Sequence, residues 1–417
     1  MTTTKFSRRE ALLATAGATA AIVAASTFGK EPVKQARKKV VLTDEARRVH
    51  AAGFVFDGHN DLPWEMRNKA DSSFKKRDIA LPQPAMHTDI PRLKQGNVGA
   101  QFWSVYVPAE TAKAGTALQQ TLEQIQLVKE MIERYPQTFA AAVTVADIEA
   151  ARKAGKIASL IGVEGGHCIE DSLENLRRLK KLGAGYMTLT HSDTLAWADA
   201  ATDTPKHKGL SPFGEEVVRE MNRLGMLVDL SHVSDDTMRS ALRVSQAPVI
   251  YSHSSARAIA PHPRNVPDDI LKLVHENGGV VMVNFFSGFV VPESAKILAQ
   301  MFDVSRELRA KFPREEDYLR ERARWERQNP YPAGDIHHVI DHIEHIAKVA
   351  GKECVGLGSD YDGITKTPAQ LEDVSTYPLI TQELLTRGWQ PAEIHALLSG
   401  NILRAMRQAE EVAEKIK

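Results

Sequence analysis

The sequence predicts an α/β fold and, within that class, a closed (β/α)8 TIM-like barrel. From residue 53 onward, short runs rich in β-branched and aromatic residues alternate with amphipathic helical stretches, which is the pattern of a parallel sheet covered by helices. Eight such runs occur, which is the number of strands that closes the barrel. Five of the runs end in a histidine or a carboxylate, and active sites of such barrels lie at the C-terminal ends of the strands.

The expected strands lie at 54–58, 98–106, 157–163, 185–190, 226–231, 248–252, 279–285 and 355–359. Helices are expected between them at 115–135, 171–182, 212–224, 234–245, 267–277 and 335–350. Gly183, Gly225 and Gly278 follow three of these helices, where a left-handed residue commonly ends a helix. A helix at 44–52 should precede the barrel, and an amphipathic helix over 391–417 should pack on it.

The stretch 286–334 is longer than a normal connection between a strand and a helix. Its highly charged part, FPREEDYLRERARWERQ, predicts a solvated helix or an oligomer contact in preference to chemistry. We therefore expect one (β/α)8 domain over 44–417 that carries this insertion and a C-terminal helix.

The N-terminus has the pattern of a twin-arginine export signal over 1–26. Arg8 and Arg9 precede the run ALLATAGATAAIVAAS, which is too short and too rich in alanine to span a membrane permanently. No cysteine is present there to carry a lipid, so we expect no stable membrane anchor. Residues 27–43 would form a linker, and the protein would be periplasmic or extracellular. A disordered basic tail is the alternative interpretation.

Composition argues against a nucleic-acid partner and against a cysteine-based site. The chain has 417 residues, of which 43% are hydrophobic and 25% charged, so it can bury a large core. The formal net charge is zero, which argues against a nucleic-acid partner. Cys168 and Cys354 are the two cysteines, and without a C-x-x-C pair they indicate neither a disulfide framework nor a thiolate zinc site. We expect free buried thiols, with a bond between the two as the alternative.

The pattern H-x-D occurs three times, at His59, His87 and His191. His59 and Asp61 end an apolar run before a proline, and alternate residues of a strand point the same way, so both side chains can bind one metal ion. The pair His87 and Asp89 follows PQPAM, which lacks strand character, and is interpreted as a surface loop pair.

Further residues that can bind a metal ion end other predicted strands. Together with the first pair, the candidate residues at the strand ends are His59, Asp61, Glu164, His232, His253 and Asp360. Without Asp360, this set holds three imidazoles and two carboxylates and no thiolate, which suits Zn²⁺, with Mn²⁺ or Co²⁺ as substitutes. Glu164 is the natural bridge, since a carboxylate can offer one oxygen to each of two ions. Two ions about 3.5 to 4 Å apart can hold a hydroxide between them at neutral pH.

The segments DGHNDLP, EGGH, LTH, DLSH, SHSSARAIAPHPRN and GSDYDG follow one another in this order. In order and spacing, the chain from about residue 45 to 410 resembles the membrane dipeptidase (renal dipeptidase) family of binuclear zinc peptidases. The resemblance implies a barrel related to the amidohydrolases, two zinc ions per chain and a dipeptide substrate.

The resemblance also assigns roles to residues. It makes His59 and Asp61 ligands of one zinc ion, His232 and His253 ligands of the other, and Glu164 the bridge. Asp360 matches the carboxylate that transfers a proton, His191 the histidine that stabilises the oxyanion, and Arg264 the arginine that binds the terminal carboxylate of the substrate. The chain would then be an exported zinc dipeptidase that hydrolyses an amide bond with a hydroxide bridging the two ions.

Other interpretations remain open at this stage. The same site could serve an amidase, a lactonase or a β-lactam hydrolase, and a non-catalytic exported binding protein is a third candidate. A homodimer is an open expectation. His337, His338, His342 and His345 are expected to be packing or surface residues. We expect His167 and His262 to orient ligands, and Asp229 and Asp362 to flank the site.

Overall fold

The computed structural model of the chain describes residues 37–312 and 314–416. The expected export signal over 1–26 and the first part of the expected linker lie outside the described residues, and the expected domain boundaries stay predictions. Residues Lys39–Lys417 form one compact unit. In the described part of the chain, no helix is both long and apolar enough to cross a lipid bilayer.

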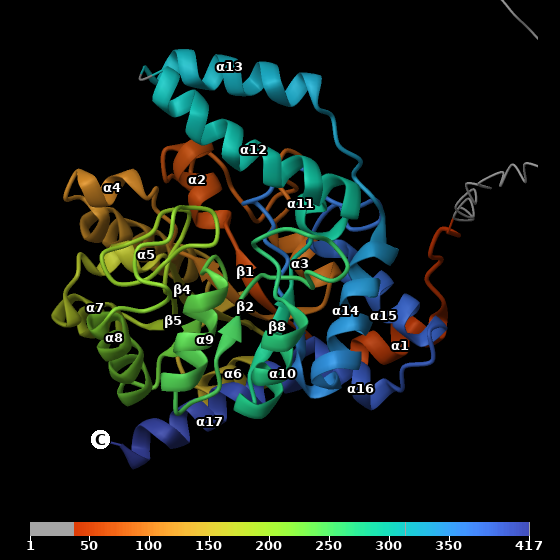
Figure 1. Cartoon of the computed structure of the whole chain (residues 1–417). Helices are drawn as coiled ribbons and strands as arrows, with labels where there is room; N and C mark the ends of the chain where they lie inside the picture. Colours follow the sequence, from red (N-terminus) through yellow and green to blue (C-terminus); the bar gives the residue numbers. More distant parts are fainter. Residues whose placement is uncertain (1–36, 313, 417) are drawn as a thin grey trace, which may run out of the picture. The chain divides into compact units, whose positions relative to one another are not determined.

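Eight parallel strands close into a barrel with helices around it, which confirms the predicted fold (Figure 1). The strands are β1 (Val55–Asn60), β2 (Val98–Ser104), β4 (Ile157–Glu164), β5 (Ala184–Thr188), β6 (Leu227–Asp229), β7 (Ile250–Tyr251), β8 (Val280–Val283) and β9 (Val355–Leu357). Pairing of β2 with β4 and of β1 with β9 completes the ring. Each strand falls within or overlaps a predicted run. Their residues are buried on both faces, as helix-covered parallel strands require.

A ninth strand, β3 (Phe139–Ala141), was not predicted. It pairs with the first half of β4, where Ala140 lies opposite Ala158, whereas β5 pairs with β4 only from Ile161 onward. β3 therefore fills the edge of β4 that β5 leaves free, and it lies outside the ring. Three residues, two of them alanine, carry too little periodicity for a prediction from sequence.

Seven helices match the expected stretches. They are α1 (Asp44–Ala52), α5 (Ala117–Arg134), α7 (Leu173–Lys181), α8 (Pro212–Arg223), α9 (Asp235–Val244), α10 (Asp268–Asn277) and α14 (Ile336–Ala350). The sequence did not predict α2 (Leu62–Ala70), α3 (Ile90–Gln95), α4 (Glu110–Lys113), α6 (Val145–Lys153) and α15 (Tyr377–Thr386). The predicted last helix consists of α16 (Pro391–His395), a π-helical turn (Ala396–Gly400) and α17 (Asn401–Lys415).

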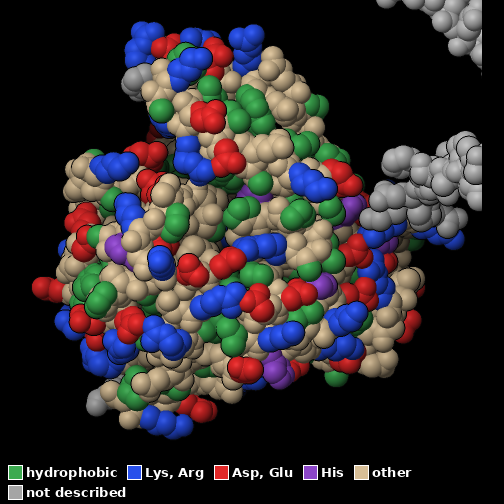
Figure 2. Space-filling view, viewed as in Figure 1, with side chains coloured by type: hydrophobic (Ala, Val, Ile, Leu, Met, Phe, Trp, Pro, Cys, Tyr) green, Lys and Arg blue, Asp and Glu red, His purple; other side chains and the backbone are tan. Residues whose placement is uncertain are grey.

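The insertion folds into α11 (Ser287–Val290) and a hairpin of two longer helices, α12 (Pro292–Lys311) and α13 (Glu315–Gln328). The hairpin extends above the barrel at the top of Figure 1. Basic and acidic side chains are mixed over its outer face in Figure 2. The charged stretch therefore forms a helix with a solvated face, as the sequence predicted.

The interior of the barrel is filled by apolar side chains below the C-terminal ends of the strands. Phe56 of β1 stacks on Phe102 of β2 with ring centroids 5.4 Å apart, and Phe102 contacts Tyr186 of β5 at 4.7 Å. Ile402 and Met406 of α17 belong to the same buried cluster, so the last helix packs on the barrel as expected. Both cysteines are free and buried, as predicted. The filled interior leaves the C-terminal ends of the strands for a site.

We predict that Gly358→Ala destabilises the barrel, because a Cβ at this position would overlap the backbone carbonyl oxygen of Ser252. Such overpacking should lower the free energy of unfolding by about 1–3 kcal/mol. Gly400→Ala is the control: its Cβ would meet the His395 oxygen at 3.6 Å, an ordinary contact, and should change stability by at most about 1 kcal/mol. Denaturant unfolding measures both. Equal stability of the two variants would contradict the close approach at Gly358.

Candidate metal centre

Five side chains predicted as metal ligands meet at the C-terminal ends of the strands. His59 lies in β1, Asp61 follows it at the start of α2, and Glu164 is the last residue of β4. His232 and His253 follow β6 and β7. These segments are far apart in sequence, and the closure of the barrel brings them together.

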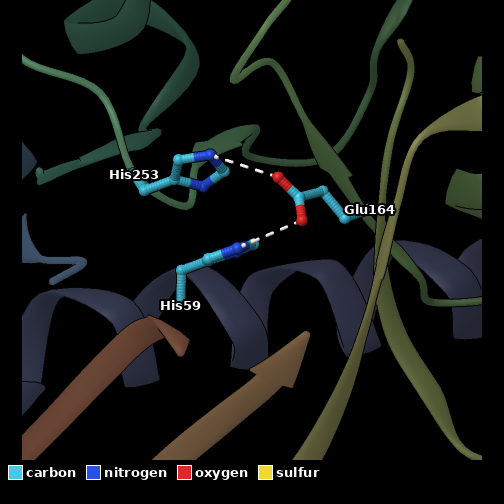
Figure 3. Close-up of side chains that lie close together, drawn as sticks. All are labelled: His59, Glu164 and His253. Atoms are coloured by element: carbon cyan, nitrogen blue, oxygen red, sulfur yellow. Dashed lines mark ion pairs between the residues drawn. The ribbon is translucent and has the colours of Figure 1, made fainter. Parts of the chain in front are cut away.

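Glu164 lies at the middle of the group. Its Oε2 is 3.4 Å from His59 Nε2, and its Oε1 is 3.2 Å from His232 Nε2 and 3.6 Å from His253 Nε2. Figure 3 shows His59 and His253 directed at different oxygens of this carboxylate. The two oxygens therefore face two different sets of nitrogen atoms, which is the arrangement that a bridging ligand requires.

Backbone geometry allows the close approach to Glu164. Gly165, directly after it, has φ +118°, a conformation that residues with a Cβ rarely adopt. His232 and Asp360 have φ of 69° and 65°, in the left-handed region, although both carry side chains. Strain of this kind costs of the order of 1–3 kcal/mol and concentrates at functional sites.

Asp61 and Asp360 complete the side of the site nearest His59. Asp61 Oδ2 is 3.2 Å from His59 Nε2. Ligand atoms of His59, Asp61 and Asp360 all lie within 4.8 Å of one another, so the structure also brings Asp360 within reach of a metal ion. Asn284 Nδ2 donates a hydrogen bond of 2.8 Å to Asp360 Oδ2. Burial, opposed by His59 and reinforced by the neighbouring Asp61 and Glu164, raises the pKa of Asp360 to about 8.

His191 and Arg264 border the same centre. His191 Nε2 is 3.6 Å from Glu164 Oε1, and its ring lies 4.3 Å from that of His232. Burial lowers the pKa of His191 to about 4, so its imidazole is neutral at pH 7.

The hydrogen-bond donors of the Arg264 guanidinium are only partly used by the protein. Arg264 is 2% exposed, and its side chain donates hydrogen bonds to Ser254 Oγ and to the His253 carbonyl, both 3.3 Å long. Its Nε is buried without a hydrogen-bond partner. The nearest acidic residues along the sequence, Asp268 and Asp269, have other partners, since Asp268 contacts His345 and Asp269 pairs with Arg239. The remaining donor capacity suits an anion in the adjoining cavity.

Two buried aspartates hold the ligands in place, and sequence reasoning missed one of them. Asp57 accepts hydrogen bonds from the Ser359 amide, the Ser359 hydroxyl and the Tyr377 hydroxyl at 2.7–2.8 Å, which fixes β9 beside β1. Asp229, which was noted only as flanking the site, accepts from the Ser252 amide at 2.8 Å and the Ser252 hydroxyl at 2.7 Å. The signal for both was an aspartate two or three residues before a ligand histidine.

The far nitrogens of two candidate ligand histidines, His253 and His59, are also engaged. His253 Nδ1 lies 2.8 Å from Ser252 Oγ, which in turn donates to Asp229. His59 Nδ1 lies 2.8 Å from the Tyr186 hydroxyl. Such partners orient a metal-binding imidazole and leave Nε2 of each ring directed into the site. Neither Ser252 nor Tyr186 was predicted.

The donor set fits divalent metal ions. His59 Nε2 and Asp61 Oδ1 are buried without a hydrogen-bond partner, which is costly unless another group satisfies them. Burial and the Arg264 charge lower the pKa of His232 well below its usual value, and burial does the same for His253, so both imidazoles are neutral and able to bind a metal. Imidazole and carboxylate ligands without thiolate are suited to zinc.

A cavity of about 410 Å³ opens above the centre. Trp64 and Tyr106, whose rings lie 4.9 Å apart, form part of its wall. The insertion forms another part, with Phe286, Phe289, Met301, Phe302 and Arg322. Arg322 belongs to the charged stretch that was expected to form a solvated helix or an oligomer contact, and its side chain also lines this cavity.

Most of the other histidines have structural roles. His337 contacts Glu383 at 3.0 Å, and His342 is buried with Nδ1 accepting from the Ala256 amide. His338 caps α14 through Asp335, so the four histidines of this stretch are packing or surface residues as expected. His167 Nε2 donates to the Val107 carbonyl instead of contacting a ligand.

Two expectations near the site need correction. Asp89 is not a surface residue: it is fully buried, caps α3 and pairs with Arg92 at 2.7 Å. His87, the other residue of this H-x-D pair, is half-buried and accepts a hydrogen bond from the Asp362 amide. His262 accepts a hydrogen bond from the Arg264 amide at 3.1 Å. It therefore orients Arg264, and not one of the candidate metal ligands as expected.

Comparison with known proteins relates the chain to one family. The model of the family described as membrane dipeptidase (peptidase family M19) matches residues 43–417. Among curated proteins, Dipeptidase 3 of Mus musculus is 41% identical over 367 residues, which is 87% of this chain and 65% of the relative. The chain thus spans about two thirds of the length of that relative.

Solved structures share the fold at lower identity. The probable dipeptidase PvdM from Pseudomonas aeruginosa has a TM-score of 0.78 and 23% identity, covering 88% of this chain and 98% of its own. A metallo peptidase from Rhodobacter sphaeroides, solved with a phosphinate mimic of the dipeptide L-Ala-D-Ala, has a TM-score of 0.70 and 23% identity over 85% of this chain and 99% of its own. Both are similar in fold to the barrel described above.

We predict that Ser252→Ala weakens the support of the centre, because Ser252 Oγ contacts both Asp229 Oδ2 and His253 Nδ1. The loss leaves buried polar atoms without this partner and should lower the free energy of unfolding by about 1–3 kcal/mol. Ser240→Ala, at a half-buried position of α9, should change it by no more than about 0.5 kcal/mol. Urea unfolding compares the two, and equal losses would remove the proposed role of Ser252.

Proposed function

Since the chain belongs to the membrane dipeptidase family, peptidase family M19, we propose that it is a zinc-dependent dipeptidase. The observation that carries the proposal is the position of Glu164, whose two oxygens face separate sets of imidazole nitrogens beside the buried Arg264. The similarity to Dipeptidase 3 supports it, as does the dipeptide mimic bound to the Rhodobacter metallo peptidase.

Two metal ions would share the bridge. His59 and Asp61 would hold one ion with Glu164, and His232 and His253 would hold the other with the same carboxylate. We propose zinc for both, with Mn²⁺ or Co²⁺ as substitutes. When bound, the ions would supply a hydroxide bridging them as nucleophile at neutral pH and would polarise the carbonyl under attack.

Arg264 would set the length of the substrate. Its buried guanidinium has donors left for an anion, and the free C-terminal carboxylate of a dipeptide is an anion of suitable shape for a planar fork of N–H groups. A longer peptide places its carboxylate one residue farther from the metal ligands. The selection of dipeptides would therefore follow from the fixed spacing between Arg264 and the centre.

His191 and Asp360 would handle charge and protons. A neutral His191 can donate a hydrogen bond to the oxygen that becomes negative during attack on the carbonyl. Burial raises the pKa of Asp360, which favours a protonated carboxyl group that would pass its proton to the departing amine. Asn284 would keep the carboxyl group of Asp360 oriented for that transfer.

The alternatives use the same centre with a different substrate. An amidase, lactonase or β-lactam hydrolase would also need the metal ligands but would not need a free carboxylate at Arg264. A non-catalytic binding protein would not require a complete donor set, and all five ligand positions here carry competent side chains. The substrate therefore separates these alternatives better than the metal does.

We predict that the purified full-length chain carries about two zinc ions and that Glu164→Ala loses both, because one carboxylate serves both ions. Glu174→Ala, an exposed carboxylate of α7, should retain them. Elemental analysis of the three proteins measures the metal content. A single tightly held ion that survives Glu164→Ala would disprove the binuclear site.

We predict that a dipeptide whose C-terminal carboxylate is amidated has a kcat/KM roughly 10- to 150-fold lower than the free dipeptide. This factor corresponds to the loss of one charge-assisted contact with Arg264. Arg264→Lys should not restore the wild-type discrimination, because a point charge lacks the planar fork. Arg257→Lys is the control, since Arg257 is engaged with Asp235.

The panel for this measurement contains an L-L dipeptide, its amide, an L-D dipeptide, an N-acyl amino acid, a lactone and a β-lactam. Hydrolysis of the free dipeptide with strong discrimination against the amide supports the dipeptidase. Equal rates on the dipeptide and its amide, or turnover of the lactone or β-lactam alone, would point to one of the alternative hydrolases.

A further inference from the structure

A second cavity adjoins the one above the metal ligands. Its volume is about 530 Å³, within the roughly 300–1,000 Å³ that ligand pockets occupy. Phe286, Met301, Arg322 and Thr365 line both cavities, so the two spaces share a wall. The other lining residues come mainly from α12, α13 and the segment that follows α13.

The walls of the second cavity are mainly apolar. Leu298, Leu319, Ala323 and Trp325 line it together with Phe286 and Met301. Its charged side chains, Arg322 and Glu326, form an ion pair at 3.0 Å one helical turn apart. Asn329 Nδ2 donates to the Trp325 carbonyl at 2.9 Å. Because these polar groups are paired within the wall, the cavity suits an apolar ligand better than a charged one.

Aromatic rings connect this cavity to Arg264. The Arg264 guanidinium lies 5.3 Å from the centroid of the Phe289 ring, and Phe289 packs edge-on against Phe286 at 4.9 Å. Phe286 then lines the second cavity. The distance from the carboxylate-binding group to this cavity is therefore spanned by two adjacent rings.

The structure of a dipeptide connects Arg264, the proposed carboxylate-binding group, with the second cavity. In its C-terminal residue, the carboxylate and the side chain are attached to the same Cα. When Arg264 holds the carboxylate, that side chain starts beside Phe289 and Phe286. A side chain several bonds long would extend from there toward the residues that line both cavities, whereas a methyl group would not.

We propose that the second cavity receives the side chain of the C-terminal residue of the dipeptide and favours large apolar side chains such as those of phenylalanine, leucine and methionine. This inference rests on the proposed dipeptidase function. The hairpin of α12 and α13 is then the specificity-determining element of the enzyme. Leu319, which is 49% exposed, marks the solvent-facing edge of the cavity, so an aromatic ring is accommodated without complete enclosure.

The test measures kcat/KM of the zinc-loaded full-length chain for L-Ala-L-Phe, L-Ala-L-Ala and L-Ala-L-Asp. Burial of an aromatic side chain should favour the first over the second roughly 10-fold or more. L-Ala-L-Asp should be no better than L-Ala-L-Ala, because the charges of the wall are already paired.

Two variants locate the effect. Ala323→Phe fills the cavity from α13, and Trp325→Ala removes part of its wall, so each should reduce the preference for L-Ala-L-Phe about five-fold or more. Ala310→Phe, on an exposed position of α12, should leave the preference unchanged. Thermal melting verifies that each variant is folded, and if Ala323→Phe fails to fold, Trp325→Ala decides the question.

The outcomes separate the two proposals. Hydrolysis of all three substrates without preference for L-Ala-L-Phe, or a preference that survives in the folded cavity variants, would overturn the inference and leave the dipeptidase intact. A preference for L-Ala-L-Asp would also overturn it. Absence of hydrolysis of any dipeptide, with metal bound, would refute the proposed function and with it this inference.

Discussion

Glu164 is 4% exposed, and its carboxylate lies among the imidazoles of His59, His232 and His253. The negative charge of this carboxylate has to be compensated. Ser104 Oγ donates one hydrogen bond to it at 2.9 Å, which is not sufficient for a buried charge. Burial and Arg264 keep His232 neutral, so its ring offers a lone pair instead of a positive charge. Compensation by divalent cations is what this arrangement favours, and the surrounding structure is organised to permit it.

The support of the centre explains why it depends on the whole barrel. Asp57 ties β1 to β9 and to α15, while Asp229 ties β6 to β7 through Ser252. Each aspartate is fully buried and accepts hydrogen bonds from the backbone and from hydroxyl groups. The histidines are therefore fixed by the contacts that also hold neighbouring strands together. A change in these contacts should affect both stability and metal binding.

The metal ligands and the insertion contribute differently to the proposed chemistry. The proposed ligands belong to the barrel, so the proposed attack on an amide bond would take place at the strand ends. Phe286, Phe289 and Arg322 belong to the insertion, which forms one side of the cavity above them. Because Phe289 packs between Arg264 and Phe286, carboxylate recognition and side-chain recognition would be mechanically connected.

The sequence by itself predicted the barrel and the group of donor side chains that the structure brings together at the strand ends, because strand periodicity and strand-end residues are local signals that do not depend on distant contacts. It did not reveal β3, whose three residues become a strand only by pairing with β4. It also did not show that Tyr186 and Ser252 are hydrogen-bond partners of His59 and His253, or that Asp89 is buried. These features, and the position of Arg322 in the wall of the cavity above the centre, are decided by the tertiary structure. Each of them depends on segments that are distant in sequence and that meet only when the barrel closes and the hairpin folds over its mouth.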